Sequence, residues 1–247
     1  MARRLADSIW LRPEPKGRQP GLSRSQIASA ALAIADAEGF EQVTMRRVAA
    51  RLRAGTMTLY HYVRTKDDLV ALMDDALMAQ VLVPSAELSK AWREAISAIA
   101  RRTRAVFSQH SWALVSMHLA PPGPHAMEHF EQCLAALAEA PLEPADKLVL
   151  LGAVDDLAFG SALRAGDAKR REQVTRATER VIRKLGEQML ATGNFPHISA
   201  LFEGRSDKQS AALFTSTTED ERFELGLTAI LDRFDPASAR RRSTRKR

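Results

Sequence analysis

The sequence predicts an all-α fold in which a small N-terminal helical unit precedes a larger helical unit. Apolar residues recur at spacings of three and four along most of the 247 residues, which is the period of an amphipathic helix. No hairpin dipeptide such as Asn-Gly stands between two alternating apolar runs, so strand signals are weak. Several Ser and Thr residues are followed three positions later by Gln or Asp, a pattern that begins helices. These three observations favour helices throughout.

The first helix is expected at 24–38. Ser23 and Gln26 form a capping-box pattern at its start, and Gly39 suits the position just after the last helical residue. Apolar side chains line one face between these signals: Ile27, Ala30, Ala31 and Ile34. The segment before this helix, 1–22, is rich in Pro and Arg and is predicted to be a flexible basic arm.

Three further helix signals follow closely. Thr44 has the side chain of an N-cap for a short second helix, and the sequence RAGT, which begins at Arg53, interrupts this helix. A third helix is expected at 56–63. Thr65 and Asp68 then form another capping box, which opens a longer fourth helix.

Beyond Pro84 the sequence predicts six more helices, separated by short loops. They are expected at 90–109, 111–117, 125–140, 144–165, 172–191 and 220–234, with loops at 121–124 and 203–210. The chain then divides into an arm (1–22), a first domain (23–69), a second domain (70–235) and a basic disordered tail (236–247).

Composition favours a soluble protein of the cytoplasm. The single cysteine, Cys133, rules out a disulfide within one chain. The longest apolar runs, such as 148–151 and 157–159, are far shorter than the roughly 20 residues of a membrane span. Residues 1–21 lack the apolar stretch of a secretory signal. We therefore expect no membrane contact.

The net charge of +6 is unevenly distributed. Residues 1–70 hold 12 Lys/Arg against 7 Asp/Glu, residues 71–231 hold 17 against 21, and residues 232–247 hold 7 against 2. The basic charge therefore lies at the two ends. This asymmetry favours a polyanion partner for the N-terminal region, although ordinary solubility explains many basic patches equally well.

The segment 43–69 has the parts of a helix-turn-helix: two short helices, a tight break, and a small residue, Ala49, at the helix crossing. The start of the second helix in such a unit faces base edges in the major groove. Hydroxyl and methyl groups there suit bases and phosphates, and the ammonium of Lys66 suits a phosphate. The sequence predicts that these side chains face DNA; the alternative is that Tyr60 and Tyr62 are packing residues.

The stretch TMRRVAARLRAGTMTLYHYVRTKDDLVALM, which begins at Thr44, resembles the DNA-binding domain of the TetR family of bacterial repressors over about 23–77. The resemblance rests on a Thr-initiated second helix, the Leu-Tyr pair that ends at Tyr60, and a basic link ending in Lys66. It implies that Arg46 reads a base and that Thr56, Met57 and Thr58 begin the base-reading helix. It also implies phosphate contacts by Thr44, Tyr60, Tyr62 and Lys66.

The chain departs from the family pattern at the turn. The family usually has Gly directly after the Leu that ends the second helix, whereas this chain has Arg53 there and its glycine at Gly55. A positive φ at that position costs a non-Gly residue about 1 kcal/mol or more. The basic residues of the arm enter an adjacent minor groove or simply add solubilising charge: Arg3, Arg4, Arg12, Lys16 and Arg18.

The second domain resembles the C-terminal domain of the tetracycline-repressor type, both in HSWALVSMHLAPPGPHAMEHFEQCLAAL from His110 and in ERFELGLTAILDRFD from Glu221. The resemblance implies a homodimer through a four-helix bundle of 144–165 and 220–234 with their copies. Both helices carry broad apolar surfaces that two-fold pairing would bury: Leu148, Leu151, Val154, Leu157, Ala158 and Leu163 in one, Phe223, Leu227, Ile230, Leu231 and Phe234 in the other. Packing within one chain is the alternative.

The second domain also supplies large apolar side chains of the kind that line a small-molecule cavity. They are Phe107, Trp112, Met117, His118, Phe130 and Phe159. The alternative at each position is ordinary core packing. By the resemblance, His118 aligns roughly with a histidine that ligates magnesium in the tetracycline repressor. The glutamate that is its partner there aligns near Arg164, whose charge is wrong for binding a cation. His125 and His129 share a helical face without a third ligand, so we predict neither a metal nor another cofactor.

These features predict a homodimeric repressor that binds a palindromic DNA operator and is released by a small-molecule effector. An enzyme with a DNA-binding head is one alternative, but the sequence has no G-x-S-x-G, H-E-x-x-H, P-loop or dinucleotide motif. Its adjacent carboxylates, Asp155 and Asp156, lie on different helical faces. A non-specific architectural DNA binder is another alternative, and it would show no sequence preference.

Overall fold

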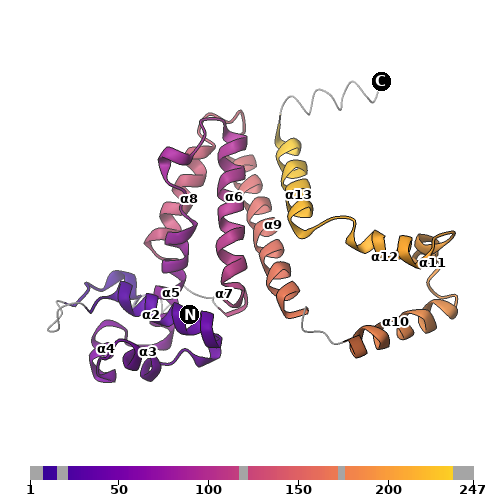
Figure 1. Ribbon diagram of the computed structural model, residues 1–247. Coiled ribbons are helices and arrows are strands. Elements are labelled where there is room, and N and C mark those ends of the chain that lie inside the picture. Colours follow the sequence, from indigo (N-terminus) through magenta and orange to yellow (C-terminus); the bar gives the residue numbers. More distant parts are fainter. Residues whose placement is uncertain (1–7, 16–21, 117–121, 172–175, 236–247) are drawn as a thin grey trace.

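The computed structural model describes residues 8–15, 22–116, 122–171 and 176–235, which form an all-α protein (Figure 1). No strand occurs in these ranges, so the predicted fold class is confirmed. The α-helices are α2 (Arg24–Glu38), α3 (Met45–Arg51), α4 (Thr56–Tyr62), α5 (Lys66–Val81), α6 (Trp92–Gln109), α7 (Ser111–Ser116), α8 (Pro124–Ala136), α9 (Pro144–Arg171), α10 (Arg176–Ala191), α11 (Pro196–Phe202), α12 (Asp207–Thr215) and α13 (Glu219–Phe234). There are also three short 3-10 helices: η1 (Ile9–Leu11) precedes α2, η2 (Phe40–Gln42) lies between α2 and α3, and η3 (Ser85–Glu87) lies between α5 and α6.

The first domain consists of α2, α3, α4 and the start of α5. The predicted helix starts are confirmed, because Ser23 with Gln26 and Thr65 with Asp68 each form both hydrogen bonds of a capping box. Gly39 ends α2 with a φ of 93°. Side chains from all four helices reach 0% exposure and form one core: Ile27, Ala31, Val48, Leu59, Leu69 and Met73.

Residues 8–15 fold against this core, which corrects the prediction of a flexible arm for that part of the chain. Ile9 of η1 is 1% exposed within the first core. Arg12 forms an ion pair of 2.6 Å with Asp68, so it is engaged with the protein rather than with DNA. Arg24 donates to the main-chain oxygens of Ile9 and Arg12 at 3.2 and 2.9 Å. We call residues 8–15 the N-terminal strap; the other basic residues of the arm lie outside the described residues.

The turn between α3 and α4 accommodates Arg53 in a left-handed backbone. The N–H of Arg53 donates to the carbonyl of Ala50 at 3.1 Å, and the N–H of Ala54 donates to the carbonyl of Ala49 at 3.0 Å. These are the two hydrogen bonds of a Schellman motif. Arg53 has a φ of 51°, the one positive φ of a non-glycine residue in the part of the chain that the structure describes. Gly55 is instead the N-cap of α4, with an ordinary φ of −71°.

Replacing Arg53 with glycine is expected to stabilise the protein by about 1 kcal/mol, because glycine adopts a left-handed backbone without steric cost. Urea unfolding of Arg53→Gly and the wild type measures this difference. Arg51→Gly is the control, since a glycine in the last turn of α3 should cost about 1 kcal/mol. A lower midpoint for Arg53→Gly than for the wild type would show that the arginine side chain makes a contact worth more than the backbone strain.

The long helix α5 belongs to both domains, because it packs on α2 and on α8. The predicted boundary between residues 69 and 70 therefore falls inside one helix. The stretch 66–87 has the length and the mean hydropathy, 1.4, to cross a membrane. Its apolar side chains, however, fill the protein core, where Leu69, Met73 and Leu77 are each 0% exposed. A core helix explains the hydropathy of α5.

The body of the second domain consists of α6, α8, α9 and α13 (Figure 1). α9 packs along α6 on one side and along α13 on the other. Side chains from these helices and their connections form a second core: Ile96, Leu137, Leu150, Val154, Phe223 and Leu227. α13 approaches α9 closely at Gly226, where a Cβ would lie 3.1 Å from Cδ1 of Leu157. The predicted helices at 144–165 and 220–234 are present, and α9 continues to Arg171.

Figure 1 shows α10, α11 and α12 extending away from the body of the second domain. The sequence predicts α10 but neither α11 nor α12. The predicted loop at 203–210 is wrong from Asp207 onwards, because Ser206 and Gln209 form a capping box that starts α12. One face of α10 is apolar and 45 to 66% exposed: Val181, Ile182, Leu185 and Met189.

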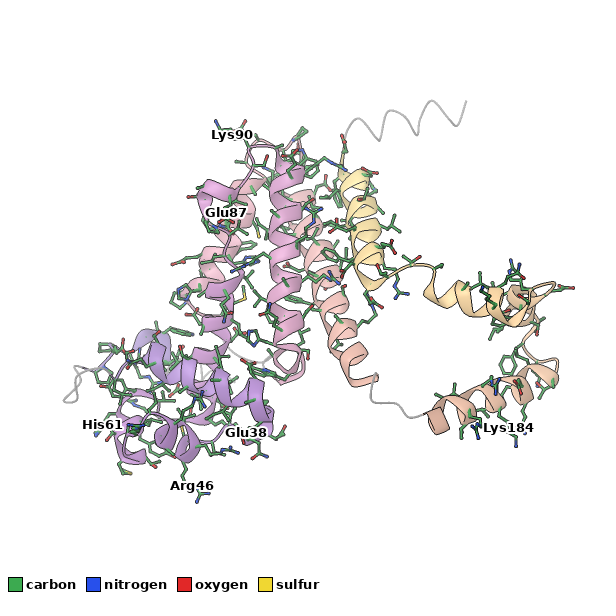
Figure 2. All side chains as sticks on the ribbon, viewed as in Figure 1. Glu38, Arg46, His61, Glu87, Lys90 and Lys184 are labelled. Atoms are coloured by element: carbon green, nitrogen blue, oxygen red, sulfur yellow. The ribbon has the colours of Figure 1, made fainter. Side chains whose placement is uncertain are left out.

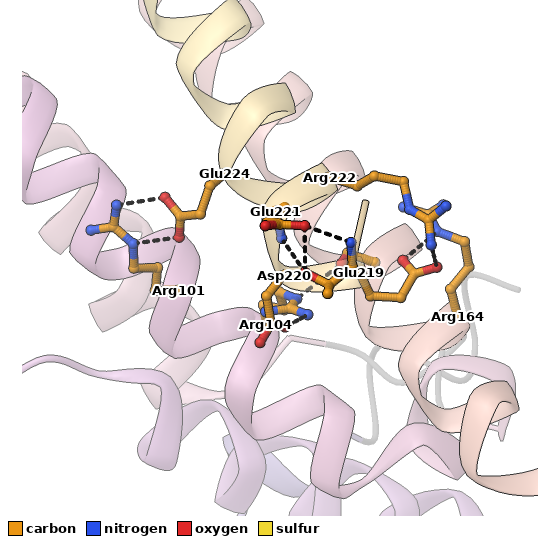
Figure 3. A network of polar contacts seen from close by, with 10 residues as sticks. Arg101, Arg104, Arg164, Glu219, Asp220, Glu221, Arg222 and Glu224 are labelled. Atoms are coloured by element: carbon orange, nitrogen blue, oxygen red, sulfur yellow. Dashed lines mark hydrogen bonds and ion pairs between the residues drawn. The ribbon is translucent and has the colours of Figure 1, made fainter. Parts of the chain in front are cut away.

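Arginine–carboxylate pairs hold the start of α13 to α6 and α9 (Figure 3). The two hydrogen bonds from Arg101 to Glu224 both measure 2.7 Å, and they lower the pKa of the Glu224 carboxyl below its ordinary value. These pairs fix the direction in which the chain enters α13. The pairs that join the first half of α13 to its neighbours are Arg101–Glu224, Arg104–Asp220 and Arg164–Glu219.

Candidate DNA interface and effector region

The predicted DNA-contacting residues of α3 lie on its outer side. Thr44 caps α3, because its hydroxyl oxygen accepts from the N–H of Arg47 at 3.3 Å. The side chain of Arg47 is bound to Glu38 and Gln42. Arg46 is exposed, has no ion pair among the described residues, and points away from the domain (Figure 2). Of the two neighbouring arginines, Arg46 is therefore the one available to a partner outside the protein.

α4 divides its side chains between the surface and the core. Leu59 is 0% exposed and Tyr62 is 4% exposed, and both belong to the first core. The expectation that Tyr62 faces outwards is therefore wrong, because residues three apart share one helical face and Leu59 fixes that face inwards. Met57 is 75% exposed and Tyr60 is 42% exposed. The outer face of α4 presents Thr56, Met57, Thr58 and Tyr60.

Lys66, the first residue of α5, is exposed. Its Nζ lies 5.1 Å from the centre of the Phe40 ring. The nearby carboxylate of Asp68 does not repel DNA strongly, because it accepts hydrogen bonds from two main-chain N–H groups and pairs with Arg12. The start of α5 therefore presents a positive charge at the edge of the first domain.

Two carboxylates tie α2 and α5 to the second domain. Oδ1 of Asp36 accepts a hydrogen bond of 2.8 Å from Nε1 of Trp112 and lies 2.7 Å from Nδ1 of His110. Asp75 accepts a hydrogen bond of 2.8 Å from the N–H of His125, and its other oxygen lies 2.7 Å from Nδ1 of the same residue. The sequence analysis did not predict these contacts, because their partners are 50 to 76 residues apart in the chain.

Two of the residues predicted to line an effector cavity meet in the interior. Phe107 of α6 and Phe159 of α9 pack edge to face, with ring centroids 5.0 Å apart. Phe107 is 5% exposed, so this contact is part of the first core. Met117 and His118 lie outside the described residues.

The other two predicted cavity residues lie elsewhere. Trp112 stacks on Phe40 of η2, with ring centroids 5.6 Å apart, and so contacts the first domain. Phe130 is 43% exposed on the surface of α8. The structure therefore does not gather the predicted residues in one place, because they were selected for size and polarity and not for a shared face.

Two buried polar groups, one on α6 and one on α8, lack hydrogen-bond partners among the described residues. Nδ1 of His129 and Oγ1 of Thr103 have no hydrogen bond among the described residues. Nε2 of His129 lies 3.7 Å from Sγ of Cys133. Burial lowers the pKa of His129; burial and then the charge of Asp155 raise the pKa of Cys133 to about 12. Burial and then the charge of Asp156 raise the pKa of Asp155 to about 6. Unpaired buried polar atoms are the groups that a bound ligand can satisfy.

A groove of about 690 Å³ lies between η3, α6 and α8. None of the predicted cavity residues lines it. Its walls are mostly small and apolar, with two glutamates at one side: Ser85, Leu88, Ser89, Ala95, Met127, Glu128, Glu131, Gln132, Ala135 and Ala136. In the described ranges, the groove included, no group of three or more His, Cys, Asp or Glu is arranged to hold a metal ion.

The apolar surfaces predicted for dimerisation are mostly buried within one chain, which corrects part of that prediction. Leu151, Val154, Ala158, Phe223, Leu227 and Leu231 belong to the second core, and Leu157, Ile230 and Phe234 pack against it. Leu148 and Leu163 remain 53% and 39% exposed. The sequence analysis missed Val149 and Leu225, which are 61% and 66% exposed. We call Leu148, Val149 and Leu225 the outer apolar face of α9 and α13.

Comparison with known protein families gives two matches. Residues 27–73 match the family described as bacterial regulatory proteins, tetR family, and residues 84–233 match the tetracyclin repressor-like C-terminal domain. The first match runs from within α2 to within α5 and includes the exposed side chains of the candidate DNA interface. The second covers both the groove and the outer apolar face.

Individual proteins resemble the chain over most of its length. The HTH-type transcriptional repressor DrrR1 of Streptomyces coeruleorubidus is 34% identical over 97% of this chain and 87% of its own length. The tetracycline repressor protein class E of Escherichia coli is 28% identical over 58% of this chain and 68% of its own length. Among solved structures, ActR of Streptomyces coelicolor in complex with actinorhodin has a TM-score of 0.64 and 28% identity, over 85% of this chain and 95% of that one.

Proposed function

Because the chain belongs to the TetR family of bacterial transcriptional regulators, we propose that it represses transcription by binding a palindromic DNA operator as a homodimer. A small molecule bound in the second domain then releases it from DNA. Members of this family are DNA-binding regulators and not enzymes, so no catalytic site is assigned. We place the protein in the bacterial cytoplasm, at the nucleoid when it is bound to DNA.

The observation that carries the proposal is the outer face of α3 and α4, where polar and apolar side chains stay exposed beside a well-filled core. We assign base contacts to Arg46, Thr56, Met57 and Thr58, and phosphate contacts to Thr44, Tyr60 and Lys66. Tyr62 keeps a supporting role, since its side chain holds α4 in the core.

The homodimer is proposed through the outer apolar face of α9 and α13. A surface with three large apolar side chains at 53 to 66% exposure on two adjacent helices suits a partner surface. Pairing with a copy of itself buries this face in a two-fold arrangement and presents two copies of α4 to successive major grooves.

For the effector, we propose the interior between α6, α8 and α9. Phe107 and Phe159 supply aromatic surface there, and the unpartnered atoms of His129 and Thr103 supply hydrogen bonds. ActR is solved with actinorhodin bound, so this compound is the first to test. Release from DNA requires that the effector bind the non-DNA-binding conformation more tightly.

A selection from random duplex DNA, with purified protein at near-physiological salt, tests the proposal. An enriched inverted repeat is the expected result. Arg46→Ala is then expected to lower discrimination at one base position by about 1–3 kcal/mol, whereas Tyr60→Phe weakens binding to all sequences. Equal base preference in Arg46→Ala and the wild type would remove Arg46 from the set of base-reading residues. No enrichment by folded wild-type protein would contradict operator binding itself.

A further inference from the structure

The side chain of Lys66, which the proposed function places at a DNA phosphate, contacts an aromatic ring outside its own helix. Its Nζ lies 5.1 Å from the centre of the Phe40 ring, and Phe40 belongs to η2, between α2 and α3. An aromatic face attracts an ammonium group through the negative potential above the ring. The contact restricts a long side chain that otherwise samples many rotamers.

Phe40 is in turn supported from the second domain. Its ring stacks on the indole of Trp112, with centroids 5.6 Å apart and planes 14° from parallel. Trp112 is oriented by a hydrogen bond of 2.8 Å from its Nε1 to Asp36. Both rings are only partly buried, so displacement of Trp112 exposes Phe40 to water.

Trp112 is positioned by the body of the second domain, because α7 is packed tightly on α9. A Cβ at Gly166 of α9 would lie 2.4 Å from Cβ of Ser111, the first residue of α7. His110, just before α7, lies 2.7 Å from the same oxygen of Asp36 that Trp112 uses. Because there is little free space between α9 and α7, a shift of α9 is expected to move α7 and with it Trp112.

We propose that Trp112 is a positioning residue for the phosphate contact of Lys66. Trp112 supports Phe40, Phe40 holds the ammonium group of Lys66 at the edge of the first domain, and a preorganised group loses less entropy on binding. The proposal rests on the proposed function. It assigns Trp112 to the control of DNA binding and removes it from the lining of an effector cavity.

The test uses the full-length protein and a mixed-sequence DNA duplex, so neither the operator nor the effector has to be known. The dissociation constant is measured from about 50 to 200 mM salt, because each phosphate contact contributes about 0.9 to the slope of log affinity against log salt. Lys66→Ala is expected to reduce this slope by about 0.9 for each bound subunit. Phe40→Leu and Trp112→Leu are expected to reduce the slope in the same direction and to weaken binding about two- to fivefold per subunit.

Double variants separate positioning from general damage. In a Lys66→Ala background, Phe40→Leu and Trp112→Leu are expected to have no further effect. Phe40→Tyr keeps an aromatic ring and should retain the wild-type slope. Trp92→Leu is the matched control, because it removes another partly buried tryptophan, packed against the second core, and should leave the slope unchanged.

Circular dichroism and thermal melting establish that each variant is folded, and if Trp112→Leu does not fold, Trp112→Met takes its place, because it also removes the ring that stacks on Phe40. The proposal is overturned if a folded Trp112 variant keeps the wild-type salt slope, if Phe40→Leu leaves the slope unchanged, or if either effect adds fully to that of Lys66→Ala. Failure of the wild type to bind any DNA would instead overturn the proposed function, so the two failures are distinguishable.

Discussion

An aspartate in place of Leu225 is expected to dissociate the proposed homodimer. Leu225 is 66% exposed on the outer apolar face, and a carboxylate buried there by a second subunit has no partner to offset its lost hydration. Each buried aspartate is expected to weaken the free energy of dimerisation by about 2 kcal/mol or more. Two-fold symmetry places one in each subunit, so the loss occurs twice. The dimer dissociation constant should therefore rise about a thousandfold.

Analytical ultracentrifugation of Leu225→Asp at low micromolar concentration measures this change. Affinity for an inverted-repeat operator should fall at least about a hundredfold, because each released subunit binds one half-site alone. Met127→Asp is the matched control, since Met127 is 62% exposed on α8, away from α9 and α13. A Leu225→Asp protein that stays dimeric would mean that the subunits pair through another surface, and the apolar face of α10 is the next to test.

Gly123→Ala is expected to destabilise the protein by about 3 kcal/mol. A Cβ at this position would lie 2.2 Å from Oδ1 of Asp75 and 2.7 Å from the ring of Trp10. Asp75 is 6% exposed and is bound twice by His125, and Trp10 belongs to the N-terminal strap. Relief of the overlap therefore costs a packing distortion of about 1–3 kcal/mol and a weakened buried hydrogen bond worth about as much.

Urea unfolding of Gly123→Ala checks this value against Gly186→Ala in α10. A Cβ at Gly186 meets no atom within 4 Å, so alanine there should be neutral or stabilising by up to about 1 kcal/mol. Equal midpoints for Gly123→Ala and the wild type would show that α8 can begin farther from α5 without loss, and that its contact with the strap is not needed for stability.

The first domain could be predicted closely because short-range signals define it. The capping boxes at Ser23 and Thr65 are completed by residues three positions away, so no knowledge of tertiary contacts is needed. Tyr62 shows the limit of a motif. Its hydroxyl suggests a polar surface role, but its ring lies three residues from Leu59 on the inner face, and burial of an aromatic body outweighs the preference of its hydroxyl.

The second domain could be predicted as a set of helices, but not as a set of surfaces. Broad apolar faces on α9 and α13 indicate burial without indicating whether the same chain or a second chain provides it. The packing of α6 against α9 decides this, and it leaves Val149 outside while Leu151 is covered. Phe107 and Trp112 illustrate the same limit, because both are large aromatic side chains, yet one lies in the interior and the other packs against η2.

The N-terminal strap has a consequence for chimeric regulators, in which the DNA-binding head of one family member is joined to the sensor of another. A head cut at the start of α2 loses Ile9 and leaves a void in its own core. A head cut inside α5 keeps Phe40 but gives it a foreign partner in place of Trp112. The transferable unit of this chain is therefore larger than its helix-turn-helix, and head and sensor are not interchangeable modules.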